Sequence, residues 1–473
     1  MKSYIRNWSL LVFSDFMGYG FGFLATILLA RRLTPAGYGT YNVILAIAAI
    51  ATIIANCGMT QVVTREIARR HEITGGVFHA VVPIRILIST LVVVGIVVYF
   101  LIFHGVSDNL IIVFTSIVTL AMTAWDLFES IAFGRHVMKY SAIINSAYTS
   151  LWFFLLWATP TPYYSIVNIL ILYSTLNVFK VIAYYLILAK RGFLAATEGA
   201  KTPGKKEIVK MSLPFLWLWG IGTFANQIPV IFLAKNSGDE QAGIFSIGAR
   251  LIIPLMLLTG TATRAIFPNL SKMSVENSQK FQKVISDGMM LIIFFGSVGA
   301  AILSMSSSYF VPFVFGEAYR GSVAPFNFLV WYAVIYSVDV LLGTALSSSD
   351  RQNTLALLAT VDTIVSLPIL YYGSLRGANY LAVAKLVVEL VLLSYHWIVI
   401  KRILGQHFSI LSWVYMAIFL MFVGIISLFQ GSFSRIEQCI VFLCIVAVSL
   451  CIPKSPFRKI PALITSQLRQ ATS

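Results

Sequence analysis

Long apolar runs separated by short polar segments repeat along the whole chain. From Tyr38 to Val63, for example, no charged side chain occurs. About 20 apolar residues in a helix that rises 1.5 Å per residue cross the hydrocarbon core of a bilayer. Runs of this kind predict fourteen transmembrane helices, at residues 8–30, 38–60, 79–103, 109–132, 142–160, 164–189, 213–234, 243–267, 287–308, 324–347, 354–373, 379–400, 411–430 and 436–452. The pattern therefore predicts an all-α integral membrane protein.

The lysines and arginines of the loops between these spans are distributed unevenly. The loops after even-numbered spans and the two termini hold 23 of them, whereas the loops after odd-numbered spans hold 6. Because cytoplasmic loops carry the excess of basic residues in membrane proteins, both termini are predicted to be cytoplasmic. The basic segments 64–72 and 201–210 are expected to lie against anionic headgroups, so membrane lipids are predicted partners.

An internal repeat divides the chain into two similar parts. The segment Leu29-Ala30-Arg31, followed by Gly39, Tyr41 and Asn42, matches Leu233-Ala234-Lys235, followed by Gly243, Phe245 and Ser246, at a constant offset of 204 residues. Duplicated halves around a central site are a common plan of transporters. The predicted organisation is an N-terminal six-helix lobe, a cytoplasmic linker, a C-terminal six-helix lobe, and two additional helices with a tail, at residues 1–189, 190–212, 213–402 and 403–473.

The composition agrees with this class of protein. Charged residues make up 11% of the 473 residues, against roughly 25% in soluble globular domains. The net charge of +16 fits cytoplasmic loops and a basic interior, so no nucleic-acid partner is expected. The four cysteines (Cys57, Cys439, Cys444 and Cys451) lack metal-ligand spacing. No catalytic motif such as HExxH or GxSxG is present, so we expect neither an enzyme, nor a metal site, nor a cofactor.

Ionisable residues inside the predicted spans are the candidates for function, because a charge at a lipid-facing helix centre costs at least about 2.5–3.5 kcal/mol. The cations are Arg85, Lys180, Arg250, Arg264 and Lys385, and we expect them to bind an anionic substrate. The carboxylates are Asp15, Asp126, Glu129, Asp339, Asp362 and Glu389. Four of these, Asp15, Asp339, Asp362 and Glu389, are candidates for coupling transport to an ion.

A purely structural role is the alternative for several of these groups. Lys385 and Glu389 lie four residues apart on one helix and could pair with each other. Asp126, Glu129 and Arg264 lie near the ends of their spans, where they could reach water. The six histidines are scattered, and most lie in loops or at span ends, so no role is assigned to them.

Three short motifs resemble a known family. They are L-A-R-x-L-x-P-x-x-Y-G-x-Y at residues 29–41, R-E-I-A-R at 65–69 and F-G-x-x-Y at 315–319. The first two are similar to the N-terminal signature of the polysaccharide (O-antigen) flippases, which belong to the multidrug/oligosaccharidyl-lipid/polysaccharide (MOP) exporter superfamily. The third resembles a loop that the same flippases carry after their ninth span.

This resemblance implies both a fold and a substrate. The fold would be two pseudo-symmetric six-helix lobes with two additional C-terminal helices in the cytoplasmic (inner) membrane. The protein would flip a polyprenyl-pyrophosphate-linked oligosaccharide across that membrane for surface polysaccharide assembly. Its partners would then be the lipid-linked oligosaccharide and, as candidates, polysaccharide assembly proteins. Arginine and lysine are suited to hold the pyrophosphate.

Two other functions stay open. A cation-coupled multidrug antiporter of the same superfamily would have twelve spans and an acidic cavity centre. A membrane-embedded glycosyltransferase or polymerase would carry a large outer loop or an acidic metal motif. The fourteen predicted spans, the basic residues within them and the short loops favour the flippase.

Overall fold

The computed structural model describes residues 2–103, 109–195 and 202–404, and it describes side chains from residue 17 onward, except those of residues 103, 109 and 404. The predicted spans 411–430 and 436–452 lie outside the described residues. Within the described part, the chain is helical throughout and contains no strand.

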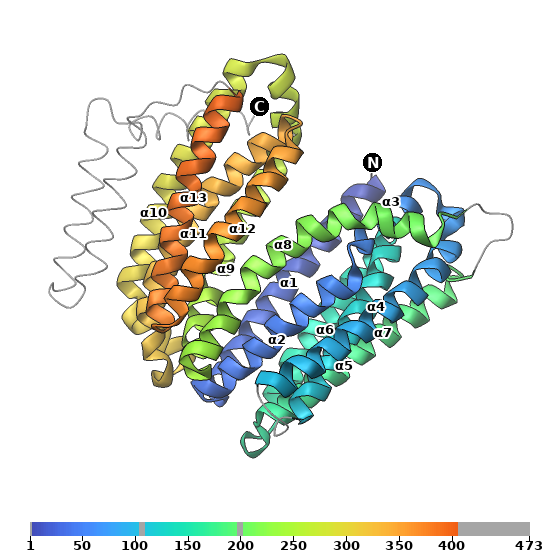
Figure 1. Cartoon of the computed structure of the whole chain (residues 1–473), viewed down its shortest axis with the longest axis horizontal. Coiled ribbons are helices and arrows are strands. Elements are labelled where there is room, and N and C mark those ends of the chain that lie inside the picture. The colour runs from blue at the N-terminus through green and yellow to red at the C-terminus, as the bar shows by residue number, and fades with distance from the viewer. Residues whose placement is uncertain (1, 104–108, 196–201, 405–473) are drawn as a thin grey trace. The chain divides into compact units, whose positions relative to one another are not determined.

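The described residues form thirteen α-helices (Figure 1). Their bounds are α1 (Lys2–Arg32), α2 (Pro35–Asn56), α3 (Met59–Arg69), α4 (Thr74–Phe103), α5 (Asn109–Gly134), α6 (Met138–Ala158), α7 (Ile166–Lys190), α8 (Lys205–Ser237), α9 (Asp239–Glu276), α10 (Ser278–Phe315), α11 (Val323–Ser348), α12 (Gln352–Ser374) and α13 (Ala378–Leu404). Short 3-10 turns occur at His71–Ile73, Thr161–Tyr163 and Glu317–Ser322.

A helix lies at each of the first twelve predicted spans. The remaining helix of the thirteen is the short α3, which corresponds to no predicted span. Among the described residues, α2 and α4 to α13 lie in eleven segments that are long and apolar enough to cross a membrane. The largest deviations are in α9 and α10, which are longer than their predicted spans because a helix can continue beyond the hydrocarbon core into the interface. The full count of fourteen spans stays a prediction.

The chain divides into two compact units, residues 1–243 and residues 244–473. In the first unit α1 packs against α6, α2 lies between α5 and α8, and α5 also packs against α7 and α3. In the second unit α11 contacts α10, α12 and α13, so it forms the centre of that unit. The boundaries predicted from the repeat stay predictions, because these units reflect packing rather than sequence similarity.

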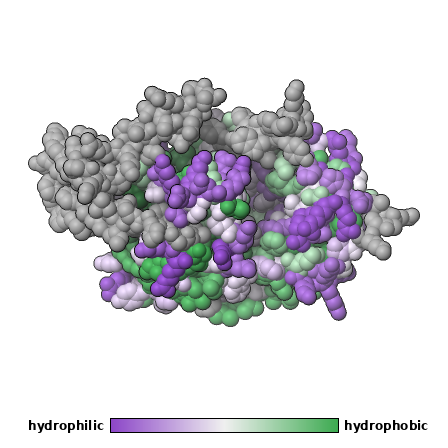
Figure 2. Space-filling model, turned by 90° about the horizontal axis from the view of Figure 1, so that it is seen from above, coloured by the Kyte–Doolittle hydropathy of each residue, from purple (hydrophilic) through white to green (hydrophobic). Residues whose placement is uncertain are grey.

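Apolar side chains on the outer faces of the helices are extensively exposed. Ile86, Leu87 and Leu91 of α4 are 61–63% exposed, and Ile102 reaches 68%. Large exposed apolar side chains in such number mark a surface that meets a membrane or another protein. In the face shown in Figure 2, hydrophilic residues (purple) gather in the middle and on the right, and hydrophobic residues (green) appear along the lower margin.

A left-handed corner joins α2 to α3. Cys57 and Gly58 have φ angles of 49° and 70°, a conformation that glycine adopts without steric cost. A Cβ atom on Gly58 would lie 2.4 Å from backbone atoms of Leu216 and Ser212 on α8. The glycine therefore allows the corner to lie directly against α8, and it fixes the point at which the amphipathic helix α3 begins.

The two repeated glycines occupy matching places in the structure. A Cβ atom on Gly39 in α2 would lie 1.8 Å from the carbonyl oxygen of Asp239, and one on Gly243 in α9 would lie 1.9 Å from the carbonyl oxygen of Pro35. Pro35 and Asp239 are the first residues of α2 and α9, and they are separated by the same 204 residues as the glycines. The close contact between the two helix N-termini is therefore reciprocal (the Gly39–Gly243 crossing).

Candidate functional site

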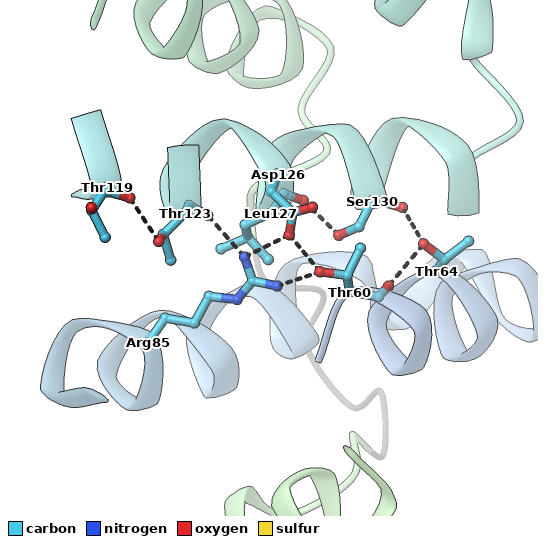
Figure 3. Close-up of polar contacts among 8 residues, drawn as sticks. All are labelled: Thr60, Thr64, Arg85, Thr119, Thr123, Asp126, Leu127 and Ser130. Carbon is cyan, nitrogen blue, oxygen red and sulfur yellow. Dashed lines mark hydrogen bonds and ion pairs between the residues drawn. The ribbon is translucent and has the colours of Figure 1, made fainter. Parts of the chain in front are cut away.

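Arg85 lies at the centre of a buried polar network in the first unit (Figure 3). It is 3% exposed, and its Nη1 donates to the carbonyl oxygen of Thr123, at 2.9 Å, and to Oδ2 of Asp126, at 3.2 Å. Its Nη2 donates to the hydroxyl of Thr60, at 3.0 Å, and that hydroxyl in turn donates to Asp126. Arg85 of α4 thus ties α3 and α5 to its own helix (the Arg85 network).

Small hydroxyl residues allow these helices to approach. Thr64 of α3 donates both to the carbonyl of Thr60, at 3.0 Å, and to that of Ser130 on α5, at 3.2 Å. Ser130 donates to the carbonyl of Leu127 within α5, at 2.7 Å. Because each hydroxyl satisfies its donor on a helix carbonyl, the interface between α3 and α5 can exclude both water and lipid.

The Arg85 network leaves little of the arginine available to a ligand. One carboxylate neutralises its charge, and only the buried Nε lacks a hydrogen-bond partner. An anionic substrate would therefore have to displace Asp126 before it could reach the guanidinium. A substrate-binding role for Arg85 stays a prediction, and the observed contacts are those of a residue that holds three helices together.

Lys180 on α7 is surrounded differently. Its Nζ lies 3.4 Å from the ring centroid of Trp125 and 4.9 Å from that of Tyr148, and the residue is 8% exposed. In the described part of the chain its ammonium forms no ion pair within 4 Å. Glu129 instead accepts hydrogen bonds from Asn145, at 2.8 Å, and from Tyr184, at 3.1 Å. Lys180 is therefore a buried cation held by aromatic rings, without a carboxylate in contact.

Three helices of the second unit meet at His396. Its Nδ1 lies 2.6 Å from Oδ1 of Asp339 on α11, and its Nε2 lies 2.9 Å from Oδ1 of Asp362 on α12. His396 itself, on α13, is 5% exposed. The structure thus brings together two carboxylates that were predicted separately, through a histidine to which no role was assigned (the Asp339–His396–Asp362 cluster).

Lys385 and Glu389 lie on the same helix as His396. Their side chains do not come within ion-pair distance in the described structure, so the pair that their spacing allows is not formed. Nζ of Lys385 lies 4.8 Å from the ring centroid of Tyr332 on α11. Glu389 is 8% exposed. The buried Glu389 and the half-buried Lys385 therefore add charge close to the Asp339–His396–Asp362 cluster.

The remaining candidates stand apart from these clusters. Arg250 is half-buried and Arg264 is exposed, both on α9, and neither forms an ion pair with the described residues. Asp15 lies in α1, and its side chain is outside the described part of the chain.

His396 is the functional candidate that the sequence prediction missed. The available signal was its spacing, since Lys385, Glu389 and His396 follow one another at intervals of four and seven residues and so share one face of a helix. A polar stripe on an otherwise apolar span indicates a face turned away from lipid. The aromatic surroundings of Lys180 gave no comparable signal, because Trp125 and Tyr148 lie on other helices.

The sequence matches a known protein family. Residues 4–274 match the sequence model of the family described as "Polysaccharide biosynthesis protein". The lipopolysaccharide biosynthesis protein WzxC of Escherichia coli (strain K12) is 26% identical over 188 residues, which are 38% of this chain and 37% of WzxC. The alignment thus spans little more than a third of that relative.

Two solved structures share the fold. The lipid II flippase MurJ, in an inward closed conformation, has a TM-score of 0.70 at 13% identity, covering 95% of this chain and 99% of MurJ. An inward-facing multidrug resistance MATE family transporter of the MOP superfamily has a TM-score of 0.65 at 14% identity, covering 81% of this chain and 95% of that protein. The fold is therefore that of the MOP superfamily, as the motifs implied.

Proposed function

The chain belongs to the family of polysaccharide biosynthesis proteins, and we propose that it is a flippase for a polyprenyl-pyrophosphate-linked oligosaccharide used in surface polysaccharide assembly. The match over residues 4–274 carries this proposal. The fold shared with a lipid II flippase and the partial similarity to a lipopolysaccharide biosynthesis protein support it. The solved structures of this fold named above are a flippase and a transporter rather than enzymes.

The proposed arrangement in the cytoplasmic membrane extends beyond the described helices. Fourteen spans, including 411–430 and 436–452, would form two six-helix lobes with two additional helices, and both termini would be cytoplasmic. The excess of lysine and arginine in the termini and even-numbered loops supports this orientation. Transporters built from such repeats open their site to each side of the membrane in turn.

Lys180 is the best supported of the proposed substrate-binding cations. A buried ammonium without a carboxylate in contact can gain a counter-ion from the pyrophosphate, and this gain offsets the cost of its own burial. Arg250, half-buried and without an ion pair among the described residues, is the corresponding candidate in the second unit. Arg264 and Lys385 complete the proposed set, whereas Arg85 would act by positioning α3 and α5.

The test is the flipping of a fluorescent polyprenyl-pyrophosphate sugar in proteoliposomes. The wild-type protein should move it, and Lys180→Gln should lower the initial rate roughly tenfold or more, which corresponds to an activation free energy raised by at least about 1.4 kcal/mol. Lys272→Gln is the matched control, because Lys272 has an exposed side chain at the end of α9, and its rate should equal that of the wild type.

Two outcomes would contradict the proposed function, and a third would contradict only the site assignment. If the wild type moves none of several lipid-linked sugars but exports a cationic dye along a proton gradient, the protein is an antiporter of the same fold. If the glycan on the lipid becomes longer during incubation with the appropriate sugar donors, the protein is a glycosyltransferase or polymerase. If Lys180→Gln retains the full rate in a protein that does flip, the function stands and the site assignment is wrong.

A further inference from the structure

The two contacts of His396 cannot both be hydrogen bonds without one additional proton. A neutral imidazole has one N–H donor and one acceptor nitrogen, whereas an ionised carboxylate only accepts. In this cluster both ring nitrogens lie within hydrogen-bond distance of a carboxylate oxygen, at 2.6 and 2.9 Å. Either the imidazole carries two protons or one of the two aspartates is protonated. In both cases the cluster holds one proton more than a neutral imidazole and two ionised carboxylates would hold.

Other ionisable groups surround this proton. Lys385 and Glu389 lie on α13 itself, and Glu389 is close enough for its charge to act on both His396 and Asp339. Tyr332 and Tyr336 on α11 lie close enough to Glu389 and to Asp339 for the carboxylate charges to act on them, and Asp362 is the acidic group on α12. With the stored proton present, the formal charges of this group sum to −1, and without it they sum to −2. Losing the proton therefore leaves an additional uncompensated charge in a buried site.

The geometry suits a proton and not a metal ion. Asp339 and Asp362 contact opposite nitrogens of one imidazole ring, so their oxygens do not converge on a common point. Metal ions in proteins require ligands that converge at about 2.0–2.6 Å. Within the described residues no group of three His, Cys, Asp or Glu side chains could hold one.

The two aspartates are the more exposed members of the cluster. The side chain of His396 is 7% exposed, whereas those of Asp339 and Asp362 are 24% and 22% exposed. A proton can therefore reach the cluster through a carboxylate and pass along the hydrogen bond to the imidazole. Each of the three groups comes from a different helix, so the protonation state directly affects the packing of α11, α12 and α13.

We propose that the Asp339–His396–Asp362 cluster is a proton-binding site that couples the movement of protons to the proposed flipping. The inference rests on the proposed function. When the proton leaves, one of the two hydrogen bonds becomes a contact between two acceptors, and the helices that it joined separate. When a proton returns, they pack again. Flipping therefore responds to a pH gradient across the membrane.

The first experiment compares flipping in proteoliposomes with and without a pH gradient of either polarity. In the wild type, one polarity should accelerate flipping and the other should slow it. His396→Gln and Asp362→Asn should flip at a rate that is independent of the gradient. The asparagine can donate to the imidazole without an additional proton, so Asp362→Asn keeps the contact and guards against a variant that fails to fold. His79→Gln, at an exposed position of α4, is the matched control and should respond as the wild type does.

A second experiment does not depend on transport. Purified protein in weakly buffered detergent solution is titrated with a pH-sensitive dye, and the wild type should show a proton-uptake step that His396→Gln lacks and His79→Gln retains. If the wild type flips but ignores the gradient, and its titration curve equals that of His396→Gln, the proton site is refuted while the flippase stands. If the wild type flips nothing but shows the uptake step, the proposed function falls and the proton site stands.

Discussion

The two compact units each contain a buried polar cluster that joins three helices, and the two clusters differ in whether their charge can change. In the first unit Arg85 joins α3, α4 and α5 through one ion pair and two further hydrogen bonds. In the second unit His396 joins α11, α12 and α13 through two carboxylates. A guanidinium stays protonated at any physiological pH, whereas an imidazole and a carboxylate can exchange a proton.

This difference separates a fixed connection from a switchable one. The Arg85 network is balanced, because Asp126 neutralises the arginine and neither group needs a proton from outside. The Asp339–His396–Asp362 cluster keeps both of its contacts only while it holds a proton. Two sites of similar size and burial can therefore serve opposite purposes, and the identity of the cation at the centre decides which.

The largest expected effect comes from breaking the fixed connection. Arg85→Met leaves Asp126 without its counter-ion among three packed helices, and we expect a loss of roughly 3 kcal/mol in unfolding free energy. Thermal unfolding in detergent should show it as a lower midpoint. Arg320→Met is the matched control, because Arg320 and Glu317 pair at an exposed position, and its midpoint should stay unchanged. The double variant Arg85→Met/Asp126→Leu should recover most of the loss. An unchanged midpoint in the single variant would mean that the ion pair does not hold the helices.

The pH dependence of stability should distinguish the two clusters, and this effect is expected to be smaller. The second cluster needs its proton in the folded state, so stability should be fully present at mildly acidic pH and decrease as the pH rises. The unfolding midpoint of the wild type should therefore fall toward alkaline pH, and that of His396→Gln should fall less steeply. Arg85→Met should keep the slope of the wild type at a lower midpoint. Equal slopes in all three proteins would contradict the comparison.

Lys180 offers a third case, a buried cation without a counter-ion in contact. Lys180→Met removes a cation–π interaction but also removes the cost of burying the charge, so the change in stability should be about 1 kcal/mol or less. Flipping, in contrast, should fall sharply. The measurement compares the loss of flipping with the loss of stability in each variant. The loss of flipping should be the larger effect for Lys180→Met, and the loss of stability should be the larger effect for Arg85→Met. A large loss of stability would place Lys180 with the structural cations.

The smallest expected effect concerns the hydroxyls around Arg85. Thr64→Val keeps the shape of the side chain but removes the donor to the carbonyls of Thr60 and Ser130. We expect a loss of roughly 0.5–1.5 kcal/mol, seen as a small decrease in the unfolding midpoint. Thr90→Val, whose hydroxyl bonds only within α4 at an exposed position, should change less. Equal effects would show that the bond between helices adds nothing.

The helices could be predicted from the sequence because bilayer thickness sets the length of each apolar run. The partners of the buried charges could not. Periodicity places Arg85, Lys180 and His396 on helix faces, but the rotation of each helix against its neighbours decides which groups meet. Arg85 meets Asp126, 41 residues away, and His396 meets Asp339, 57 residues away. The spacing of Lys385 and Glu389 allowed a local pair, yet in the described structure the lysine lies near Tyr332 instead.

The Gly39–Gly243 crossing bears on how the chain arose. In a symmetric dimer, residue i of one copy touches residue j of the other, and residue j of the first touches residue i of the second. The contacts of Gly39 with Asp239 and of Gly243 with Pro35 follow this rule inside a single chain. A gene encoding one half, whose product paired with itself, would have built both contacts from one glycine. Duplication and fusion of such a gene would leave each copy free to mutate alone, in agreement with Tyr41 and Asn42 standing opposite Phe245 and Ser246 in the alignment of the repeat.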